Sequence, residues 1–497
     1  MDLFSVLFFI KLFVSLSLGI LACTIILLPL VFYAARRHLH KKRSAGAEPG
    51  VKRVGVFHPY CNAGGGGEKV LWCAVRAMQL RYPTAEVAVY TGDLDCSPDE
   101  MLTRARQRLN TAVPRPVRLV YLRRRRWVEA ARYPCFTLLG QSLGSVVLGL
   151  EALFSYVPDL YIDTMGYAFT YPLFKYLGGC RVASYTHYPT ITSDMLRRVA
   201  SRSAAHNNRP AIAGSRSLTL GKMLYYRLFA WLYRLVGRCA DIVMVNSSWT
   251  EEHINEVWQC PLRTHRVYPP CDVSELKALP LLSDGDASPA PDVGAGRTRR
   301  SGKVRIVSVG QFRPEKDHPM QLRSMYQLRQ IVPEEVWDNL TLVIVGSCRN
   351  REDEERVQDM KDLCKHLSLE NNVQFRVNIS HRELRQELQQ GLVGLHSMWN
   401  EHFGIGIVEC MAAGLIMVAH RSGGPQMDIV EESEGSRTGF LASDEDEYAR
   451  AIAAILRMTP AGRRAIREAA RASVDRFSIH EFEKGFLRAV DPFFSKS

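Results

Sequence analysis

The amino-acid sequence predicts an α/β protein in which two doubly wound domains face each other across a cleft, behind an N-terminal membrane helix. Two series of short β-branched runs alternate with longer amphipathic stretches, which is typical of parallel sheets covered by helices. Residues 283–302, rich in Gly, Pro, Ser and Asp, separate the two series. A long uncharged run precedes both series. The 497 residues leave room for two or three domains with large cores.

The N-terminus is expected to hold the protein on a membrane. Residues 12–35 form a 24-residue run without a charged side chain, which is long enough to span a bilayer. A cleaved secretory signal would have a shorter apolar core and a small-residue cleavage site. Residues 36–50 follow as a basic juxtamembrane linker, whereas residues 1–11 contain a single lysine. The positive-inside tendency therefore places residues 1–11 in the lumen and everything after residue 36 in the cytosol.

Residues 51–275 are expected to form the first domain, which faces the membrane. Its predicted strands are 52–58, 86–91, 117–122, 181–187 and 242–246. A flexible linker, residues 276–302, then leads to the second domain.

Residues 303–475 are expected to form that second domain, in which the alternation of strands and helices begins again. Its predicted strands are 304–309, 341–345, 373–377, 393–397 and 415–419. Residues 476–497 are expected to form a C-terminal helix that packs back towards the first domain. In such sheets ligands bind outside the carboxyl ends of the strands, so we expect the site in the cleft between the domains.

The net charge of +13 favours a polyanionic partner such as nucleic acid, an anionic membrane or a phosphorylated ligand. Ten arginines lie between Thr103 and Arg132, against one acid, Glu129. The sequence has no helix-turn-helix, zinc or RNP-like pattern, so we expect no nucleic acid and assign this charge to lipid phosphates. Twelve cysteines without a C-x-x-C pair indicate buried thiols in a reduced compartment.

Two further stretches bear on membrane contact. Residues 195–240 contain nine Lys or Arg and no acid, and predict an amphipathic helix suited to lipid headgroups. One face of this helix would carry Arg227, Arg234 and Arg238. A neighbouring apolar stripe would consist of Leu224, Leu228, Trp231 and Leu235. An ordinary surface helix is the alternative. Residues 134–157 are very apolar but contain Gln141 and Glu151, which favours a core or interface helix over a second span.

The first stretch that carries chemistry is VGQFRPEKDH, Val309 to His318, which follows a predicted strand. Gly310 permits a sharp turn, and Arg313 and Lys316 come after it. Cations at this edge of the sheet can hold a diphosphate and neutralise charge as it leaves. A solvated lysine in an ordinary loop is the alternative interpretation.

The second such stretch is WNEHFGIGIVECMAAG, Trp399 to Gly414. A helix is expected to begin near Gly404, where backbone amides favour phosphate and glycine permits close approach. Glu401 lies before this helix, and Glu409 lies about five residues into it, about 7 Å along its axis. The two acids are therefore expected to contact different parts of one elongated ligand.

The first domain supplies a glycine run and a histidine. HPYCNAGGGGEKVLW, His58 to Trp72, follows the first strand and contains Gly64 to Gly67 before a helix. Such a loop accommodates phosphate, but it is not a Walker loop because no G-K-[ST] follows. His187 ends another strand and is expected to point into the same cleft. A flexible turn and a structural histidine are the alternatives.

These stretches together resemble the retaining nucleotide-sugar glycosyltransferases of the GT-B type (family 4), built from two Rossmann-like domains. The resemblance spans residues 50–480. More narrowly, HPYCNAGGGGEKVLW, SYTHYPT, GQFRPEKDHPMQL and NEHFGIGIVECMAAG are similar to the eukaryotic GDP-mannose-dependent α-1,2-mannosyltransferases that act on dolichyl-diphosphate-linked oligosaccharide.

The resemblance implies a role for each site residue. Glu409 would bind the ribose hydroxyls of GDP, and Glu401 would hold the hydroxyls of the donor mannose. Arg313 and Lys316 would hold the diphosphate. The amides of Gly404 and Ile405 would assist with the diphosphate. Gly66 and Gly67 would let the first domain approach the diphosphate. His187 would face the sugar. Many relatives carry an arginine where this chain has Gln311, which makes Lys316 the firmer assignment.

The resemblance also implies substrates, partners and location. The donor is GDP-mannose, and the acceptor is Man3GlcNAc2, then Man4GlcNAc2, on dolichyl diphosphate at the cytosolic face of the endoplasmic reticulum membrane, in the assembly of the N-glycan precursor. Other mannosyltransferases of that pathway fit as partners. No protein nucleophile, cofactor or metal is expected. Asp93-Leu94-Asp95 is similar to a metal motif of another glycosyltransferase fold, but it lies outside the predicted cleft.

Several rival functions remain open from the sequence. A glycosidase also needs two carboxylates, about 5–5.5 or 6.5–9.5 Å apart. A GT-B-type nucleotide-sugar epimerase, another mannosyl- or N-acetylglucosaminyltransferase with a lipid-linked acceptor, and a non-catalytic membrane scaffold are further rivals. The presence of Glu401, Lys316 and the glycine loops argues against the scaffold.

Overall fold

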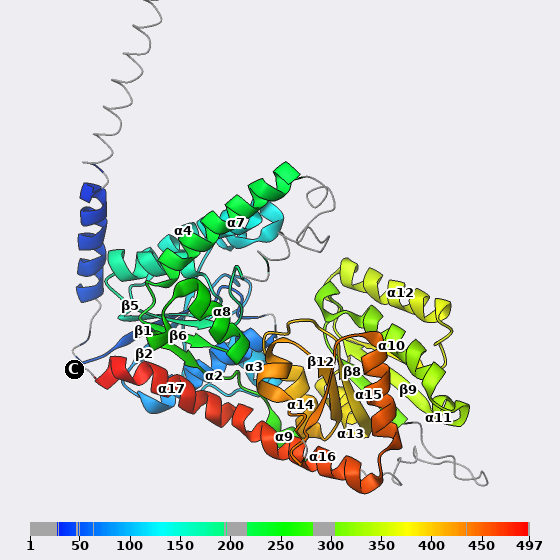
Figure 1. Cartoon of the computed structure of the whole chain (residues 1–497). Coiled ribbons are helices and arrows are strands. Elements are labelled where there is room, and N and C mark those ends of the chain that lie inside the picture. Colours follow the sequence, from blue (N-terminus) through cyan, green and yellow to red (C-terminus); the bar gives the residue numbers. More distant parts are fainter. Residues whose placement is uncertain are drawn as a thin grey trace, which may run out of the picture.

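A computed structural model describes residues 29–45, 50–62, 64–192, 216–281, 304–433 and 435–495, together with Leu27, Glu48 and Met195. Most of the predicted anchor, residues 12–35, and most of the predicted linker, residues 276–302, lie outside the described residues. The described chain forms two lobes, each with a central sheet (Figure 1).

Seven parallel strands form the sheet of the N-terminal lobe, in the order β3-β2-β1-β4-β5-β6-β7. They are β1 (Arg53–Phe57), β2 (Glu86–Thr91), β3 (Arg118–Tyr121), β4 (Leu160–Asp163), β5 (Arg181–Thr186), β6 (Ile242–Val245) and β7 (Thr264–Arg266). The five predicted strands of this lobe are confirmed. We did not predict β4 and β7: β4 closely follows the long apolar stretch 134–157, and β7 has only three residues.

The helices of this lobe cover both faces of its sheet. They are α2 (Gly66–Arg81), α3 (Pro98–Leu109), α4 (Thr137–Ser155), α7 (Arg216–Gly237) and α8 (Ser248–Trp258). The helix α2 begins inside the glycine run, and Trp72 on it is buried in the core behind β1. The core on the opposite face contains Trp258 of α8 together with residues of α4 and α7.

Six parallel strands form the sheet of the C-terminal lobe, in the order β10-β9-β8-β11-β12-β13. They are β8 (Val304–Val309), β9 (Leu340–Gly346), β10 (Val373–Val377), β11 (Gly391–His396), β12 (Ile416–His420) and β13 (Gly439–Ala442). All five predicted strands are confirmed, and only the four-residue β13 was missed.

The helices of the C-terminal lobe are α10 (His318–Ile331), α11 (Glu334–Asp338), α12 (Arg351–His366), α13 (His381–Gln390), α14 (Ile405–Ala413), α15 (Glu445–Arg457) and α16 (Pro460–Ser473). Among them α14 is the most enclosed, with six of its nine residues buried. It packs against α16 and against the short helix α9 (Val273–Lys277). Its position is therefore fixed by the core of the lobe.

The chain passes between the lobes twice, and the two crossings lie side by side. The first runs from β7 to α9, and the second runs from the short helix Val474–Phe477 to α17 (Ile479–Ser495). The amide of Cys271 donates to the carbonyl of Phe477 at 3.0 Å, and Cys271 pairs with Ser478 in a parallel bridge. Beyond this crossing α17 runs along the N-terminal lobe and buries Phe482 and Phe486 against α2 (Figure 1).

Each sheet reverses its strand order at one point, between β1 and β4 in the first lobe and between β8 and β11 in the second. In doubly wound sheets ligands bind outside the carboxyl ends of the strands at this reversal. The loops after β1 and β4 and the loops after β8 and β11 therefore mark where a ligand is expected. These loops contain the glycine run and both of the stretches singled out in the second domain.

The apolar helix α4 packs on the N-terminal lobe. Among the described residues it alone is long and apolar enough to cross a membrane, by length and composition only, and 39% of its most apolar window is buried. A Cβ atom at Gly144 would lie 1.8 Å from the carbonyl oxygen of Trp127, so the helix touches the backbone of the preceding loop. This packing supports the interpretation as an interface helix.

The N-terminal helix, residues 29–45, rises from the N-terminal lobe (Figure 1). Lys42 Nζ donates to the carbonyl of Phe154 at 2.5 Å, and Arg43 Nε donates to Asp159 at 2.8 Å. Residues 36–45, part of the stretch 36–50 that we expected to form a linker, are helical, and two of their basic side chains bond the lobe.

Candidate active site

Lys316 and Glu401 meet at the strand-order reversal of the C-terminal lobe. Lys316 lies seven residues after the end of β8, and Glu401 lies five residues after the end of β11. Lys316 Nζ forms an ion pair with Glu401 Oε2, and His396 Nε2 lies 3.1 Å from the same oxygen. The carbonyl of Glu401 accepts a hydrogen bond from the amide of Gly424 at 2.8 Å. Both ends of this glutamate are therefore held in place.

The neighbours of Glu401 determine its charge. Burial alone raises the pKa of this carboxyl group. The hydrogen bond from His396 and the positive charge of Lys316 outweigh burial and hold the pKa of Glu401 well below its usual range. Glu401 is therefore ionised at neutral pH, and an ionised carboxylate accepts hydrogen bonds from hydroxyl groups.

The helix α14 begins next to this pair, as predicted. Gly404 precedes it with a φ of +116°, a backbone conformation that residues other than glycine rarely adopt. Ile405 is the first helical residue, and the amides of Ile405 and Gly406 have no hydrogen-bond partner among the described residues, whereas that of Ile407 donates to the carbonyl of Gly404 at 3.0 Å. The amides of Ile405 and Gly406 can receive a diphosphate beside Lys316.

Glu409 lies in the middle of α14 and has different neighbours from Glu401. Its side chain is 27% exposed, and its Oε1 lies 3.9 Å from Nζ of Lys69 on α2. Burial raises the pKa of Glu409, Lys69 lowers it, and Asp272 raises it further. Glu401 and Glu409 share no partner among the described residues. This favours contacts to different parts of one ligand over a pair acting on one glycosidic bond.

Arg313 lies in the same loop as Lys316 but is held less firmly. Its guanidinium contacts Glu315 at 3.7 Å, and its side chain is 35% exposed. Its Nε is buried and has no hydrogen-bond partner among the described residues. Arg313 is thus free to turn towards an anion at the start of α14.

The N-terminal lobe brings Gly66, Gly67 and His187 to the same junction. A Cβ atom at Gly66 would lie 2.8 Å from Cδ1 of Ile405, so the glycine run touches the start of α14. A Cβ atom at Gly67 would lie 3.6 Å from Nε2 of His187. All nine residues proposed from the sequence therefore lie on loops or helices that meet between the lobes.

His187 is arranged to accept a hydrogen bond. Its ring bonds the backbone carbonyl of Thr164, and its Nε2 is buried without a partner among the described residues. Burial, opposed by that bond, lowers the pKa of His187 to about 4. The neutral ring donates to Thr164 through Nδ1, so Nε2 carries a lone pair that can accept from a sugar hydroxyl.

Aromatic and polar contacts hold the lobes together beside these groups. The ring of Tyr188 lies 4.1 Å from that of His402, and Trp249 lies 5.2 Å from His402. Asp428 of the C-terminal lobe accepts from the amide of Ser248 at 2.9 Å, from its hydroxyl at 2.6 Å and from Tyr268 at 2.9 Å.

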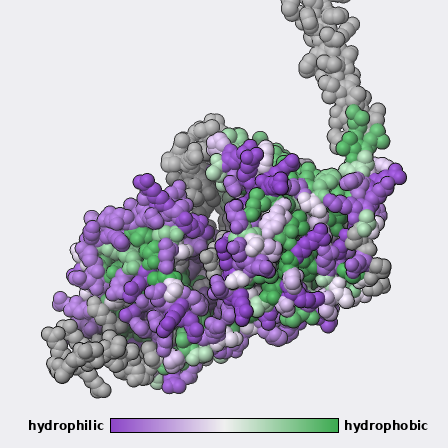
Figure 2. Space-filling view, turned by 180° about the vertical axis from the view of Figure 1, so that it is seen from behind, coloured by the Kyte–Doolittle hydropathy of each residue, from purple (hydrophilic) through white to green (hydrophobic). Residues whose placement is uncertain are grey.

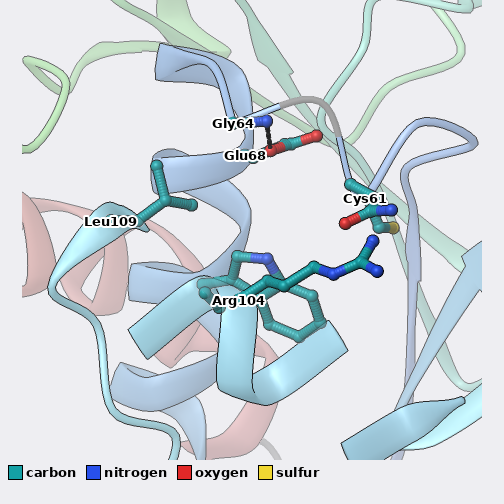
Figure 3. Close-up of a pocket in the computed structure, with 8 residues that line it drawn as sticks. Cys61, Gly64, Glu68, Arg104 and Leu109 are labelled. Carbon is teal, nitrogen blue, oxygen red and sulfur yellow. Dashed lines mark hydrogen bonds between the residues drawn. The ribbon is translucent and has the colours of Figure 1, made fainter. Parts of the chain in front are cut away.

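A carboxylate of the N-terminal lobe itself holds the glycine run in place. Glu68 accepts a hydrogen bond from the amide of Gly64, which closes the loop onto the start of α2 (Figure 3). The cavity beneath it, between Cys61 and Arg104, has a volume of about 10 Å³. Because that volume holds at most one water molecule, this cavity is not the ligand site.

Four residues of this site were not predicted from the sequence: Lys69, Asp272, His396 and His58. Lys69 directly follows the glycine run and Glu68, and His396 interrupts an otherwise apolar strand, so each left a weak signal. His58 Nδ1 lies 2.8 Å from the hydroxyl of Thr164 and so supports the loop that binds His187. Asp93, of the possible metal motif, instead pairs with Arg125 and accepts from the amide of Cys61 at 2.7 Å.

Two family models match this chain: "ALG11 mannosyltransferase N-terminus" over residues 51–258 and "Glycosyl transferases group 1" over residues 295–473. The mouse GDP-Man:Man(3)GlcNAc(2)-PP-Dol alpha-1,2-mannosyltransferase is 49% identical over 481 residues, 95% of this chain and 94% of the relative. The human relative of the same name is 51% identical over 441 residues, 89% of this chain and 87% of the relative. The chain belongs to this alpha-1,2-mannosyltransferase family. It is a glycosyltransferase, as the resemblance implied.

Solved structures confirm the GT-B fold of this mannosyltransferase family member. HepE of Anabaena in complex with UDP has a TM-score of 0.59 at 16% identity and covers 89% of this chain and 100% of that one. Sucrose-phosphate synthase of Thermosynechococcus elongatus has a TM-score of 0.61 at 18% identity, with coverage of 90% and 100%. At this identity the likeness shows the fold alone.

We predict that two buried histidines near the site make the mannosyltransferase sensitive to acid. Burial is the main cause that lowers the pKa of His58 to about 3 and that of His318 to about 4. In the unfolded chain these histidines take up protons near pH 6.5. The free energy of unfolding is therefore unaffected above that pH, and it decreases as the pH falls from 6.5 towards the pKa values of the folded protein. Each histidine should cost about 2 kcal/mol of unfolding free energy by pH 5.

Urea unfolding at pH 7.5 and pH 5.0 measures this loss. The variant His58→Gln/His318→Gln should lose about 4 kcal/mol less than the unmodified protein between the two pH values. His265→Gln, at an exposed position, is the control. An equal loss in the double variant and the unmodified protein would contradict the assignment.

Proposed function

We propose that this protein transfers mannose from GDP-mannose to Man3GlcNAc2, and then to Man4GlcNAc2, carried on dolichyl diphosphate. Each new bond is an α-1,2 linkage formed with retention. The arrangement of Lys316, Glu401 and the start of α14 opposite Gly66 and His187 supports this function most directly. The names of the relatives, which span most of this chain, point to the same donor and acceptor.

The donor would lie across the start of α14. Glu409 would accept from the ribose hydroxyls, and Lys316, Arg313 and the amides at Gly404 and Ile405 would hold the diphosphate. Glu401 would accept from mannose hydroxyls. His187 Nε2 would accept from the sugar on the side of the N-terminal lobe.

The reaction then needs no covalent intermediate with the protein. The bond between the anomeric carbon and the diphosphate oxygen breaks, and an acceptor hydroxyl forms its bond to that carbon on the same face. The proton of this hydroxyl passes to the departing diphosphate oxygen. Lys316 and Arg313 stabilise the negative charge on the diphosphate, and the carboxylate of Glu401 lies near the positive charge that develops on the sugar.

Exposed apolar side chains support attachment to a membrane. On α7 the predicted stripe of Leu224, Leu228, Trp231 and Leu235 is 44–69% exposed, while Tyr226, Phe229 and Tyr233 are buried against the lobe. Figure 2 shows the described start of the N-terminal helix as hydrophobic next to the grey segment. We propose that both contact the cytosolic face of the endoplasmic reticulum membrane, where a dolichol-linked acceptor resides.

Two of the three predicted arginines of α7 also bond the protein. Arg234 Nε donates to the carbonyl of Val257 at 3.0 Å, and Arg238 Nε donates to that of Trp258 at 3.1 Å. These two arginines therefore hold α7 to α8 through Nε. Arg227 is exposed and makes no such bond to the described residues, so we propose that the membrane contact of α7 is chiefly apolar.

The function is tested with the purified full-length protein, radiolabelled GDP-mannose and lipid-linked Man3GlcNAc2. We expect two labelled mannoses per acceptor, both released by an α-1,2-specific mannosidase. UDP-N-acetylglucosamine in place of GDP-mannose tests the rival transferase, and EDTA tests the expectation that no metal is needed. Transfer from the UDP sugar, or conversion of GDP-mannose without acceptor, would overturn the proposal.

A further inference from the structure

Lys69 is a buried lysine that reaches from the N-terminal lobe to two acids beyond it. Its side chain, on α2, is 6% exposed. Its Nζ forms an ion pair with Asp272, at the first crossing between the lobes, and lies 3.9 Å from Oε1 of Glu409 on α14. One ammonium group thus links α2, the crossing segment and the helix that begins the proposed donor site.

We propose that Lys69 is a positioning residue for the nucleotide, which aligns Glu409 and ties it to the glycine run. This inference rests on the proposed function, because it takes Glu409 to be the group that receives the ribose. It adds a residue of the N-terminal lobe to the nucleotide site and makes donor binding depend on the contact between the lobes.

The position of Lys69 supports this role. Lys69 lies three residues after Gly66, about 4.5 Å further along α2, and Glu409 lies four residues after Ile405, about 6 Å further along α14. Gly66 and Ile405 face each other at the N-terminal ends of these two helices. The contact between Lys69 and Glu409 therefore sets the spacing between the glycine run and the start of α14, where the diphosphate is proposed to lie.

The charges around Glu409 support it further. One cation, Lys69, faces two carboxylates, Glu409 and Asp272, and the thiols of Cys73, Cys271 and Cys410 lie around them. Burial lowers the pKa of Lys69, but Glu409 and Asp272 outweigh burial and raise it, so Lys69 is charged. Burial also favours the protonated form of Glu409, which Lys69 opposes. A carboxylate can accept from both ribose hydroxyls, whereas a protonated carboxyl group donates through one of its oxygens.

The experiment compares Lys69→Met and Lys69→Arg in the full-length protein, with Arg76→Met as the matched control. Arg76 also lies on α2 and forms an ion pair, with Glu483 on α17, at 3.0 Å. We expect Lys69→Met to weaken GDP binding in calorimetry, and to raise the KM for GDP-mannose, by about tenfold with a smaller change in kcat. Lys69→Arg should restore most of the binding, and Arg76→Met should leave it unchanged.

The pH profile separates alignment of Glu409 from a merely structural role. Without Lys69 the pKa of Glu409 rises, so the acidic limb of kcat/KM for GDP-mannose should move to higher pH in Lys69→Met. Asp272→Asn removes the opposing carboxylate, so that limb should move to lower pH. This second variant also provides the test if Lys69→Met does not fold.

The possible failures are distinct. If the unmodified protein binds no GDP, the proposed function fails. If it binds GDP and Lys69→Met binds equally well with an unchanged pH profile, the proposed function stands and the role of Lys69 is overturned. An unchanged acidic limb in Asp272→Asn also overturns that role.

Discussion

Replacing Glu401 with alanine is expected to remove nearly all mannose transfer while the protein remains folded. The variant loses the carboxylate that accepts from the donor sugar and stabilises positive charge near the reacting carbon. Removing one group of this kind typically lowers kcat by about a hundred- to a thousandfold. Lys316, the ion-pair partner, is 23% exposed, so water can solvate its charge in the variant and the effect on stability should be small.

Initial rates with saturating GDP-mannose and thermal unfolding curves measure the two effects separately. Glu401→Gln keeps the size of the side chain and removes its charge, so it should lose nearly as much activity as Glu401→Ala. Glu355→Gln, at an exposed position on α12, is the control. Undiminished turnover in Glu401→Ala would contradict the assignment of the active site.

Replacing Lys316 with methionine should have an effect of similar size, by a different route. The variant loses the cation next to the departing diphosphate, and it also loses the ion pair that holds Glu401. We expect kcat to fall by about a hundred- to a thousandfold. Arg313→Met should lower it by about tenfold, because the side chain of Arg313 is 35% exposed and its ion pair among the described residues, with Glu315, is loose at 3.7 Å.

A comparison of these two variants decides which cation replaces the arginine missing at Gln311. Inhibition by GDP measures binding of the diphosphate, and single-turnover rates measure the transfer step. If Arg313→Met has the larger effect on the transfer step, Arg313 is the principal cation. If both variants bind GDP equally weakly and their single-turnover rates are unchanged, both cations act in binding the diphosphate and neither acts in the transfer step.

The sheets could be predicted because their signal is local. Ten runs of apolar, β-branched residues became ten strands. The missed strands β4, β7 and β13 have three or four residues and acquire their structure from their neighbours in the sheet, whereas the four-residue strands β3 and β6 lie in longer apolar runs. Periodicity along one segment contains no information about those neighbours.

Most candidate site residues were found where glycine marks a loop, whereas His187 was found from its place at the end of a strand. Gly66 and Gly404 stand where backbone comes close or takes an unusual conformation, and Glu401, Lys316 and Glu409 lie near such glycines. Lys69 has no such mark. It pairs with Asp272 at a separation of 203 residues, and this contact exists only because the lobes come together. His396 was missed for a similar reason, since its pairing with Glu401 depends on how the loop after β11 folds back.

The paired crossings near Cys271 and Phe477 determine how the protein can open. Because both connections lie next to each other, the lobes can rotate about an axis through them, but they cannot slide apart. Displacement grows with distance from a pivot, so the segments next to these crossings, including Asp272 and its partner Lys69, should move least. The nucleotide, proposed to lie beside Glu409 and Lys69, would therefore stay close to the part that moves least, and a bulky glycolipid would enter further away, where the lobes separate more.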